Sequence, residues 1–366
     1  MRIPLSGVAD TRILPLVLQL AGAGPSLSQP ADATEPPAAA GIEVSGLVDV
    51  YYAYDANRVD PALRSFDLRH DAFTLSLAEV ALARPAGVDR RVGFRIDLDF
   101  GETAGAVAAT EPSAAAREDF RHVQQAYVSI QAGKKVLIDA GRFVTPLGAE
   151  VIESRDNWNY SRSALFGYAI PFHHVGVRAA LAAGDALVLN AYVVNGWNNS
   201  VDLDRDKTLG LGAAWKPANG VTWVATAMSG RESPAATADR LIIDSTVTVS
   251  VTPRLTLMAN GDYGTEGDTS WAGLAAYARY QVTSAWDLAG RFEYLDDGDG
   301  GFMTLGRTAR TVTLTSGHRV ADDLDLRLEY RGDFTDEPFF TDRDGDLKTS
   351  QSAALMALVY SFGGRL

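Results

Sequence analysis

The sequence predicts an all-β protein that forms a transmembrane antiparallel β-barrel of about 16 strands. Three observations lead to this fold class. Apolar and polar residues alternate with a period of two over most of the chain after residue 41, tight turns alternate with longer polar connections, and aromatic residues gather at the ends of the expected strands. Short turns at one rim and longer loops at the other are typical of outer-membrane barrels.

The composition excludes several other classes of protein. Of the 366 residues 46% are hydrophobic and 22% are charged, the net charge is −13, and cysteine is absent. A chain this apolar is not disordered, and an acidic balance gives no support for a nucleic-acid partner. Without cysteine, no disulfide, thiolate nucleophile or Cys-ligated metal site can form.

The N-terminus has the pattern of a secretory signal, predicted as residues 1–28. Two arginines precede an apolar run over 13–23, and small residues at 26–28 or 31–33 offer cleavage sites. The run is too short to span a bilayer as a helix. A buried N-terminal helix is the alternative, which the glycines and proline after the run fit poorly. Residues 29–41 form a Pro/Ala-rich linker.

The strands follow from the alternation. In 324–331, leucines and a tyrosine alternate with Asp325, Arg327, Glu329 and Arg331. A helix would spread these charges around its circumference, whereas a strand places them on one face. We expect one barrel over 42–362, followed by a C-terminal extension at 363–366. Its strands are predicted at 42–55, 73–84, 92–100, 123–131, 135–145, 173–181, 186–195, 208–216, 221–229, 240–251, 255–263, 272–281, 286–294, 308–319, 324–331 and 350–362.

The connections are of two kinds. Those rich in Gly, Pro, Asp and Asn are short and are expected as periplasmic turns. They lie at 85–90, 132–134, 182–185, 217–220, 252–253, 283–284 and 321–322. The others are expected as extracellular loops. They lie at 56–72, 101–122, 146–172, 196–207, 230–239, 264–271, 295–307 and 332–349.

The charged residues indicate which face of each strand points into the barrel lumen. Rows of Arg, Asp and Glu suit a wet lumen, and an Arg on the lipid face would cost roughly 2–4 kcal/mol at the midplane. The apolar face therefore points outward, although a soluble barrel or sandwich would reverse this order. Both signs occur in the lumen, so a purely basic lining is not expected. The predicted wall charges are Asp99, Asp139, Asp244, Arg279, Arg291, Glu293, Arg327, Glu329 and Arg331.

The connection over 146–172 is the longest and is rich in charged and aromatic residues. A connection of this length in a compact fold is usually functional, and we expect it to fold into the lumen and form a constriction. Packing over the outer rim is the alternative. The predicted constriction residues are Glu153, Arg155, Asp156 and Arg162 on the loop, facing Arg95, Asp97 and Arg178 on the wall.

No catalytic, metal or cofactor site is predicted. The chain lacks the G-x-S-x-G, H-E-x-x-H and phosphate-loop patterns. His173 and His174 are adjacent on a strand and point to opposite faces, so we expect one toward the pore and the other toward the wall or rim. The acidic runs at 202–206 and 342–346 could bind divalent cations, although solvated loops are the commoner explanation.

Several segments resemble the OmpL-like β-barrel porins of Gram-negative bacteria. These are the run from FVTPLGAEV to HHVGVR at 143–178, VVNGWNN at 193–199, VDVYYAYDANR at 48–58, GFRIDLDFG at 93–101 and EYRGDFT at 329–335. The resemblance covers nearly the whole mature chain and implies an outer-membrane barrel with a porin role. One departure concerns assembly: such barrels tend to end on an aromatic residue, but here Phe362 is followed by Gly-Gly-Arg-Leu.

The expected function is therefore that of an outer-membrane porin of a Gram-negative bacterium. It would be a passive diffusion channel for small hydrophilic solutes or ions, and its selectivity would be set by the loop and the charged wall. The expected partners are outer-membrane lipid and these solutes, with a homotrimer as one assembly and no cofactor. The alternative is a structural or adhesive barrel that its loops plug, without conductance. A soluble exported β-protein is the third reading.

Overall fold

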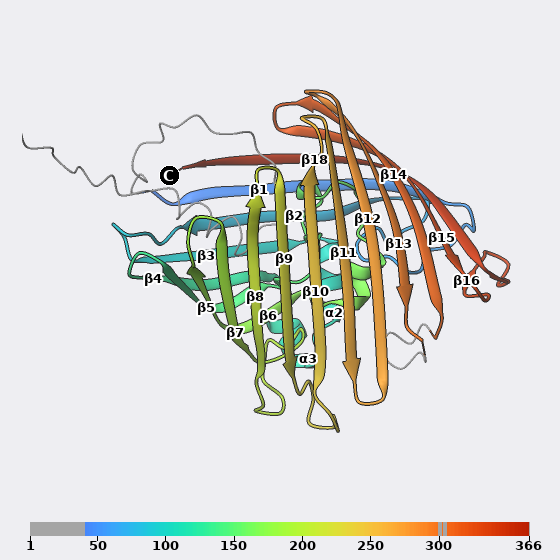
Figure 1. The fold of residues 1–366 in the computed structure, drawn as a ribbon. Helices are drawn as coiled ribbons and strands as arrows, with labels where there is room; N and C mark the ends of the chain where they lie inside the picture. Colours follow the sequence, from blue (N-terminus) through green and yellow to red (C-terminus); the bar gives the residue numbers. More distant parts are fainter. Residues whose placement is uncertain (1–40, 299–301, 303–305, 366) are drawn as a thin grey trace, which may run out of the picture.

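A computed structural model describes residues 41–298, 302 and 306–365 of the chain (Figure 1). Sixteen antiparallel strands form a closed barrel, in which each strand pairs with its neighbours and β1 pairs with β18. The predicted signal peptide at 1–28 and the linker up to residue 40 lie outside the described residues. The predicted fold class is confirmed.

The strands agree with the predicted segments to within a few residues at each end. A two-stranded hairpin, β16 with β17, stands apart from the barrel. The strands are β1 (Glu43–Asp55), β2 (Ala72–Arg84), β3 (Val92–Phe100), β4 (Val123–Ala132), β5 (Val136–Val144), β6 (His173–Ala182), β7 (Leu187–Val194), β8 (Thr208–Ala218), β9 (Val221–Gly230), β10 (Arg240–Ser250), β11 (Leu255–Glu266), β12 (Thr269–Thr283), β13 (Trp286–Asp296), β14 (Thr308–Ala321), β15 (Leu324–Thr335), β16 (Phe340–Thr341), β17 (Leu347–Lys348) and β18 (Ser350–Arg365).

The last strand is longer than the sequence suggested. We expected 363–366 to extend beyond the barrel, but β18 continues to Arg365, which lies opposite Glu43 of β1. The guanidinium of Arg365 also pairs with the Glu43 carboxylate at 3.1 Å. Two glycines after Phe362 did not end the strand, because the β1 backbone beside them continues to offer pairing partners.

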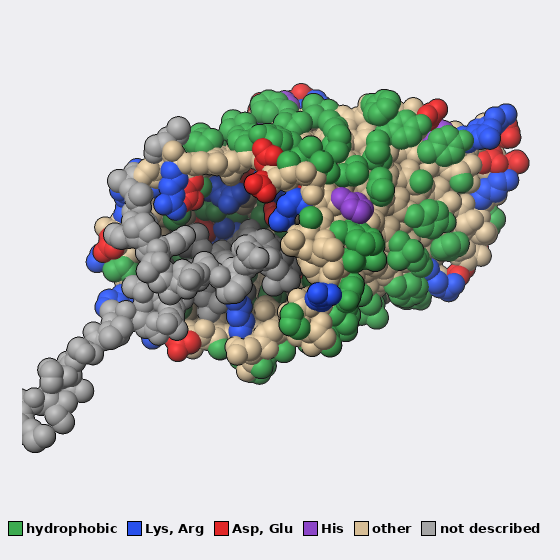
Figure 2. Space-filling model, turned by 90° about the horizontal axis from the view of Figure 1, so that it is seen from above, with side chains coloured by type: hydrophobic (Ala, Val, Ile, Leu, Met, Phe, Trp, Pro, Cys, Tyr) green, Lys and Arg blue, Asp and Glu red, His purple; other side chains and the backbone are tan. Residues whose placement is uncertain are grey.

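Apolar side chains face outward and polar side chains face the lumen. On β8, Leu209 and Leu211 are 60% and 71% exposed. On β15, Leu328 and Tyr330 are exposed, whereas the arginines and glutamate between and beside them are buried. Hydrophobic side chains cover much of the face seen in Figure 2. This is the inside-out alternation of a barrel that lies in lipid.

Exposed aromatic side chains mark both ends of the apolar belt. Trp215 and Trp223 flank the short β8–β9 turn, with ring centroids 6.3 Å apart. Tyr263 and Phe100 are exposed near the opposite rim. Amphipathic rings at both membrane–water interfaces form the aromatic girdles of outer-membrane barrels.

The long connections differ from the prediction in three places. The connection expected over 264–271 is a two-residue turn, because β11 and β12 extend to Glu266 and Thr269 and Gly267 adopts a φ of 59°. The connection after β3 contains two short helices, α2 (Glu102–Ala109) and α3 (Ala114–Asp119). The last connection contains the β16–β17 hairpin.

No helix in the described part of the chain is long and apolar enough to cross a membrane.

Candidate functional site

The connection between β5 and β6, residues 145–172, is folded into the barrel lumen; we refer to it as the lumen loop. Leu147 and Leu165 of this loop are buried in an apolar cluster that also contains Phe66 of the first long connection and Trp271 of β12. A short 3-10 turn (Ser154–Asp156) and a π-helical turn (Leu165–Ala169) shape the loop. Two extracellular connections therefore share the lumen.

Three wall arginines bind backbone carbonyl groups of the lumen loop. They come from β13 and β15, and all three are buried. Bonds from a charged donor are stronger than neutral ones, so these contacts fix the loop firmly against this side of the wall. The bonds run from Arg291 Nη1 to Ser161 O at 2.6 Å, from Arg327 Nη1 to Asn157 O at 2.7 Å and from Arg331 Nη1 to Arg162 O at 2.6 Å.

Wall carboxylates bind the loop through the opposite kind of group, its N–H and O–H donors. Glu329 accepts from the amides of Tyr160 and Ser161 at 2.6 and 2.9 Å. Glu293 accepts from the amide of Ala164 at 2.6 Å. On β1, Asp49 accepts from Tyr160 Oη at 2.9 Å and also from a serine of the loop. The wall charges therefore satisfy both donors and acceptors of the buried loop backbone.

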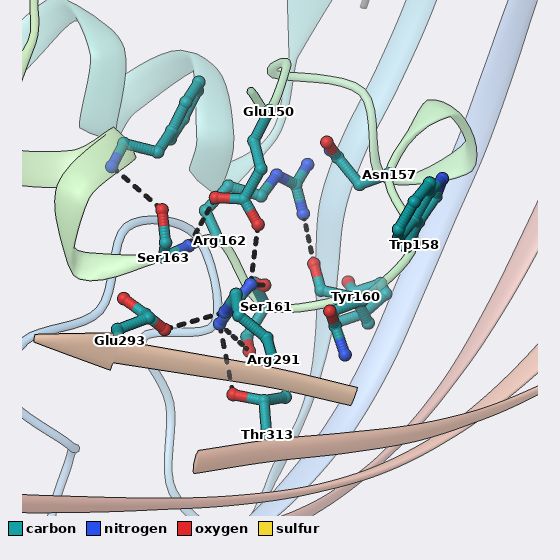
Figure 3. A network of polar contacts seen from close by, with 12 residues as sticks. Glu150, Asn157, Trp158, Tyr160, Ser161, Arg162, Ser163, Arg291, Glu293 and Thr313 are labelled. Atoms are coloured by element: carbon teal, nitrogen blue, oxygen red, sulfur yellow. Dashed lines mark hydrogen bonds and ion pairs between the residues drawn. The ribbon is translucent and has the colours of Figure 1, made fainter. Parts of the chain in front are cut away.

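Arg291 is the centre of this network (Figure 3). Its guanidinium contacts Glu150 of the loop at 2.6 Å and Glu293 of its own strand at 2.7 Å, and it also donates to Thr313 of β14 at 3.2 Å. The side chains of Arg291, Glu150 and Glu293 are at most 4% exposed. A buried ion pair is tolerated when its remaining hydrogen-bonding groups are satisfied, as they are here.

Arg162, which we placed at the constriction, lies inside the lumen loop instead. Its guanidinium donates to the carbonyls of Val151 at 3.1 Å, of Tyr160 at 2.5 Å and of Ile152. Its side chain is buried and lies 5.0 Å from the centroid of the Phe66 ring. Arg162 thus joins two stretches of the loop to each other rather than facing open space.

A cavity of about 240 Å³ lies between the lumen loop and strands β1, β3, β4 and β5. This volume can hold several water molecules. Figure 2 shows a recess bordered by both basic and acidic side chains. Four of the seven predicted constriction residues line the cavity, namely Arg95, Glu153, Arg155 and Asp156. The other lining residues are Ser45, Gln125, Val144, Thr145, Glu150, Val151, Ile152, Phe166 and Phe172.

Both arginines of the cavity have carboxylate partners. Arg95 Nε lies 2.7 Å from Asp97, which is fully buried. Arg155 donates to a backbone carbonyl of β1, and its guanidinium lies 3.4 Å from Glu79 and 3.3 Å from Asp156. Burial raises the pKa of Asp156 above its usual value, and the charge of Arg155 opposes this shift.

Two of the predicted arginines, Arg178 and Arg279, do not line the cavity. Arg178 pairs with Asp139 at 2.8 Å, and its guanidinium lies 5.1 Å from the centroid of the Tyr127 ring and 4.7 Å from that of Phe143. Arg279 pairs with an aspartate of β13 close to the short-turn rim. These contacts make structural links along the wall rather than a lining for the cavity.

Two buried aspartates face each other on β10 and β11. Asp244, which the sequence placed on the wall, lies opposite Asp262 in the strand register. Asn260 donates to Asp244 at 2.5 Å, whereas both carboxylate oxygens of Asp262 lack a hydrogen-bond partner. Asp262 was missed because 255–263 alternates only weakly.

Three other important carboxylates were not predicted: Asp49, Glu79 and Glu150. Asp49 and Glu79 lie on the polar phase of their strands, so the alternation could have identified them. Glu150 lies in the lumen loop, where the period-two alternation of strands does not apply, so its partner could not be predicted. The first long connection also enters the lumen, which was not predicted. Its buried Leu63 and Phe66 are apolar residues in an otherwise polar segment and could have indicated this.

The two histidines are both buried, and each has polar partners of its own. His173 Nε2 lies 3.4 Å from Glu111 Oε2 and 3.4 Å from Ser200 Oγ. His174 Nδ1 lies 2.9 Å from the carbonyl of Gly196. Their different partners agree with the opposite orientations of neighbouring strand residues. His174 also contacts Thr145 of the lumen loop, whereas His173 contacts the connections after β3 and β7.

The acidic runs in the loops are paired with lysines. Asp202 contacts Lys207, and Asp342 lies 3.0 Å from Lys348. Within the described ranges, no group of three or more His, Asp or Glu side chains is placed to hold a metal ion.

Solved structures of bacterial outer-membrane proteins share this fold. The anion-selective porin from Comamonas acidovorans is 10% identical, with a TM-score of 0.61, and 88% of this chain and 99% of that one are covered. Salmonella typhi OmpF is 10% identical, with a TM-score of 0.63 and coverages of 88% and 97%. OmpT of Vibrio cholerae in its trimer form is 10% identical, with a TM-score of 0.58 and coverages of 88% and 99%.

The sequence itself matches one family. No curated protein is significantly similar to the chain. Residues 41–362 match the family described as "Putative beta-barrel porin-2, OmpL-like". This match spans the whole barrel up to Phe362, and the structural neighbours have the same closed architecture. The chain belongs to the family of OmpL-like β-barrel porins.

Proposed function

We propose that the protein is a passive diffusion channel for small hydrophilic solutes or ions in the outer membrane of a Gram-negative bacterium. The observation that carries this proposal is the position of the lumen loop. It is fastened to β13 and β15 through Arg291, Arg327 and Arg331, and on the side of β3, β4 and β5 it leaves a polar cavity. In this proposal the loop narrows the pore on one side of the barrel and leaves a path for solutes on the other.

The two groups of charged residues have different tasks in this proposal. The buried charges of β13 and β15 position the loop. The charges around the cavity, carried by Arg95, Glu153, Arg155 and Asp156, face the solute and set selectivity together with the width of the opening. Solutes move down their gradient, so no cofactor takes part.

Lipid and a homotrimer complete the proposed setting. The apolar outer face supports contact with outer-membrane lipid. Vibrio cholerae OmpT, a structural neighbour, has a trimer form, and we propose the same assembly for this chain by analogy of fold.

A second candidate function is a structural or adhesive barrel that its loops plug. The packing of aromatic rings within the lumen favours it. Phe66 of the first long connection packs against Phe166 and Phe172 of the lumen loop, with ring centroids 6.0 and 5.8 Å apart. Packing of this kind would hold the two connections together in the lumen. In a plugged barrel, they would leave no continuous water-filled path.

Single-channel recording of refolded protein in planar bilayers separates the two candidates. A porin gives discrete conductance steps, and Arg155→Ala, which removes a charge at the cavity, changes their size. Arg343→Ala is the matched control, because Arg343 is 58% exposed on the β16–β17 turn. Silence from protein shown to be folded and inserted would favour the plugged barrel and overturn the porin proposal.

A further inference from the structure

We propose that this channel selects for cations, from alkali-metal ions to compact solutes that carry an ammonium group, and that Glu153 and Asp99 determine this preference. The inference rests on the proposed porin function and concerns the same cavity. The fold does not decide the sign of selectivity, since one structural neighbour is an anion-selective porin at 10% identity. The sign has to come from the charges of this chain.

The positive charges beside the cavity are neutralised by their own partners. Arg95 contacts Asp97 through two hydrogen bonds of 2.7 and 3.0 Å. Arg155 is held by Glu79 and Asp156 at 3.4 and 3.3 Å. A guanidinium held in this way presents little free charge to a passing anion, because the carboxylate beside it is at nearly the same distance from the solute.

Glu153 is a carboxylate of the cavity without a cationic partner. Its side chain lines the cavity and accepts a hydrogen bond from the neutral amide of Gln124 at 3.0 Å. Among the residues that the structure describes, no Lys, Arg or His forms an ion pair with it. The charge of Arg95 acts on Glu153 from a longer distance, but that guanidinium is already engaged by Asp97. Most of the charge of Glu153 is therefore available to a solute in the cavity.

Asp99 adds a second uncompensated carboxylate close to Glu153. It is 3% exposed on β3, and its Oδ1 atom lacks a hydrogen-bond partner. Asp99 lies opposite Glu79 in the β2–β3 register. The charge of Arg142 also acts on Asp99, but Arg142 is engaged by Glu111 at 3.9 Å and by Ser200. An unpaired carboxylate in this position attracts a cation or retains a proton.

The local charge balance is negative under either condition. Two guanidiniums, of Arg95 and Arg155, face five carboxylates. Three negative charges are in excess when all five carboxylates are ionised, and one remains in excess when Glu79 and Asp99 both hold a proton. Walls of low dielectric constant focus such a field into the opening and concentrate cations there. The five carboxylates are those of Glu79, Asp97, Asp99, Glu153 and Asp156.

The test is the reversal potential of the refolded full chain in planar bilayers under a KCl gradient. We expect the wild type to prefer K⁺. Glu153→Gln removes one unit charge at the cavity and should lower the K⁺/Cl⁻ permeability ratio roughly fivefold. Asp99→Asn should lower it in the same direction but by less, because Glu153 lines the cavity and Asp99 does not. The matched control Asp344→Asn, at a side chain 72% exposed on the β16–β17 turn, should leave it unchanged.

The outcomes separate this inference from the porin proposal. A conducting wild type that prefers Cl⁻, or shows no preference, overturns cation selectivity and leaves the porin function intact. Silence from inserted wild-type protein overturns both. If Glu153→Gln does not insert, the wild-type reversal potential and Asp99→Asn still decide the question. A ratio unchanged in both variants would overturn the assignment of these two residues.

Discussion

Arg291 of β13 and Glu150 of the lumen loop form a buried ion pair, with 2.6 Å between Nη1 and Oε1. The same Nη1 atom donates to the carbonyl of Ser161, and Nε contacts Glu293. One side chain of the barrel wall thus fixes two separated points of the loop. The position of the loop, and with it the shape of the cavity, depends on this junction.

Arg291→Met should destabilise the barrel and loosen the lumen loop. The substitution leaves Glu150 and Glu293 buried without their cationic partner, which typically costs about 3–5 kcal/mol. Thermal unfolding in detergent micelles should show a lower midpoint, and channel recordings should show noisier current. Arg310→Met is the control, since Arg310 is 52% exposed. Equal unfolding midpoints for Arg291→Met and the wild type would contradict the anchoring role.

Tyr160→Phe should have a smaller effect of the same kind. It removes the hydrogen bond from Tyr160 Oη to Asp49, while Asp49 keeps the bond from Ser154 Oγ at 2.7 Å. A buried carboxylate that loses one of two donors costs about 1–3 kcal/mol. Denaturant unfolding measures the change, and Tyr330→Phe on the outer face serves as control. A cost above that of Arg291→Met would not fit this account.

The stability of the protein should fall as the pH rises through about 7, in part through Glu232. Burial raises the pKa of this carboxyl from 4.5 to about 7, against the opposing effect of the amide of Trp197 and the charge of Arg240. Because the folded state holds the proton more tightly than the unfolded chain, this contribution is complete below the unfolded value and is lost above the folded one.

Melting temperatures between about pH 5 and pH 8 check this prediction. Glu232→Gln keeps the side-chain shape but does not titrate, so its profile should be flatter than that of the wild type. Glu118→Gln, at an exposed position on α3, should follow the wild type. A Glu232→Gln profile as steep as that of the wild type would show that other groups carry the pH dependence.

Leu211→Arg should destabilise the barrel in lipid. Leu211 is 71% exposed on the outer face of β8. An arginine in the apolar belt costs up to about 2–4 kcal/mol, depending on its depth. Folding into lipid vesicles, followed by denaturant titration, gives this cost, and Leu347→Arg on β17 of the hairpin is the control. An unchanged free energy of unfolding for Leu211→Arg would mean that the outer face does not contact lipid.

Strand periodicity made most of the fold predictable from the sequence. A charge on a transmembrane strand has to share one face with its neighbours at i ± 2, so Arg327, Glu329 and Arg331 point inward whatever their partners are. The turn at 267–268 was missed for a local reason. Gly, Asp and Thr around it are typical of both a tight turn and a longer loop.

The site could be predicted only in part, because its partners are distant in the sequence. The length and aromatic content of the loop indicated that it enters the lumen. They did not indicate that Arg162 would bind carbonyls of its own loop, or that Arg291 would meet Glu150. Those pairings depend on where the loop crosses the wall, and strand periodicity does not specify that position.

The absence of cysteine from the chain allows a direct test of the lumen loop as the constriction. Glu153→Cys introduces a single thiol at the cavity, and a bulky, charged thiol reagent is added during single-channel recording. We predict that the current falls in discrete steps as each channel reacts, whereas Asp344→Cys is labelled without loss of current. Complete labelling of Glu153→Cys with an unchanged conductance would contradict the account, because ions would then cross the barrel by a path that does not pass this loop.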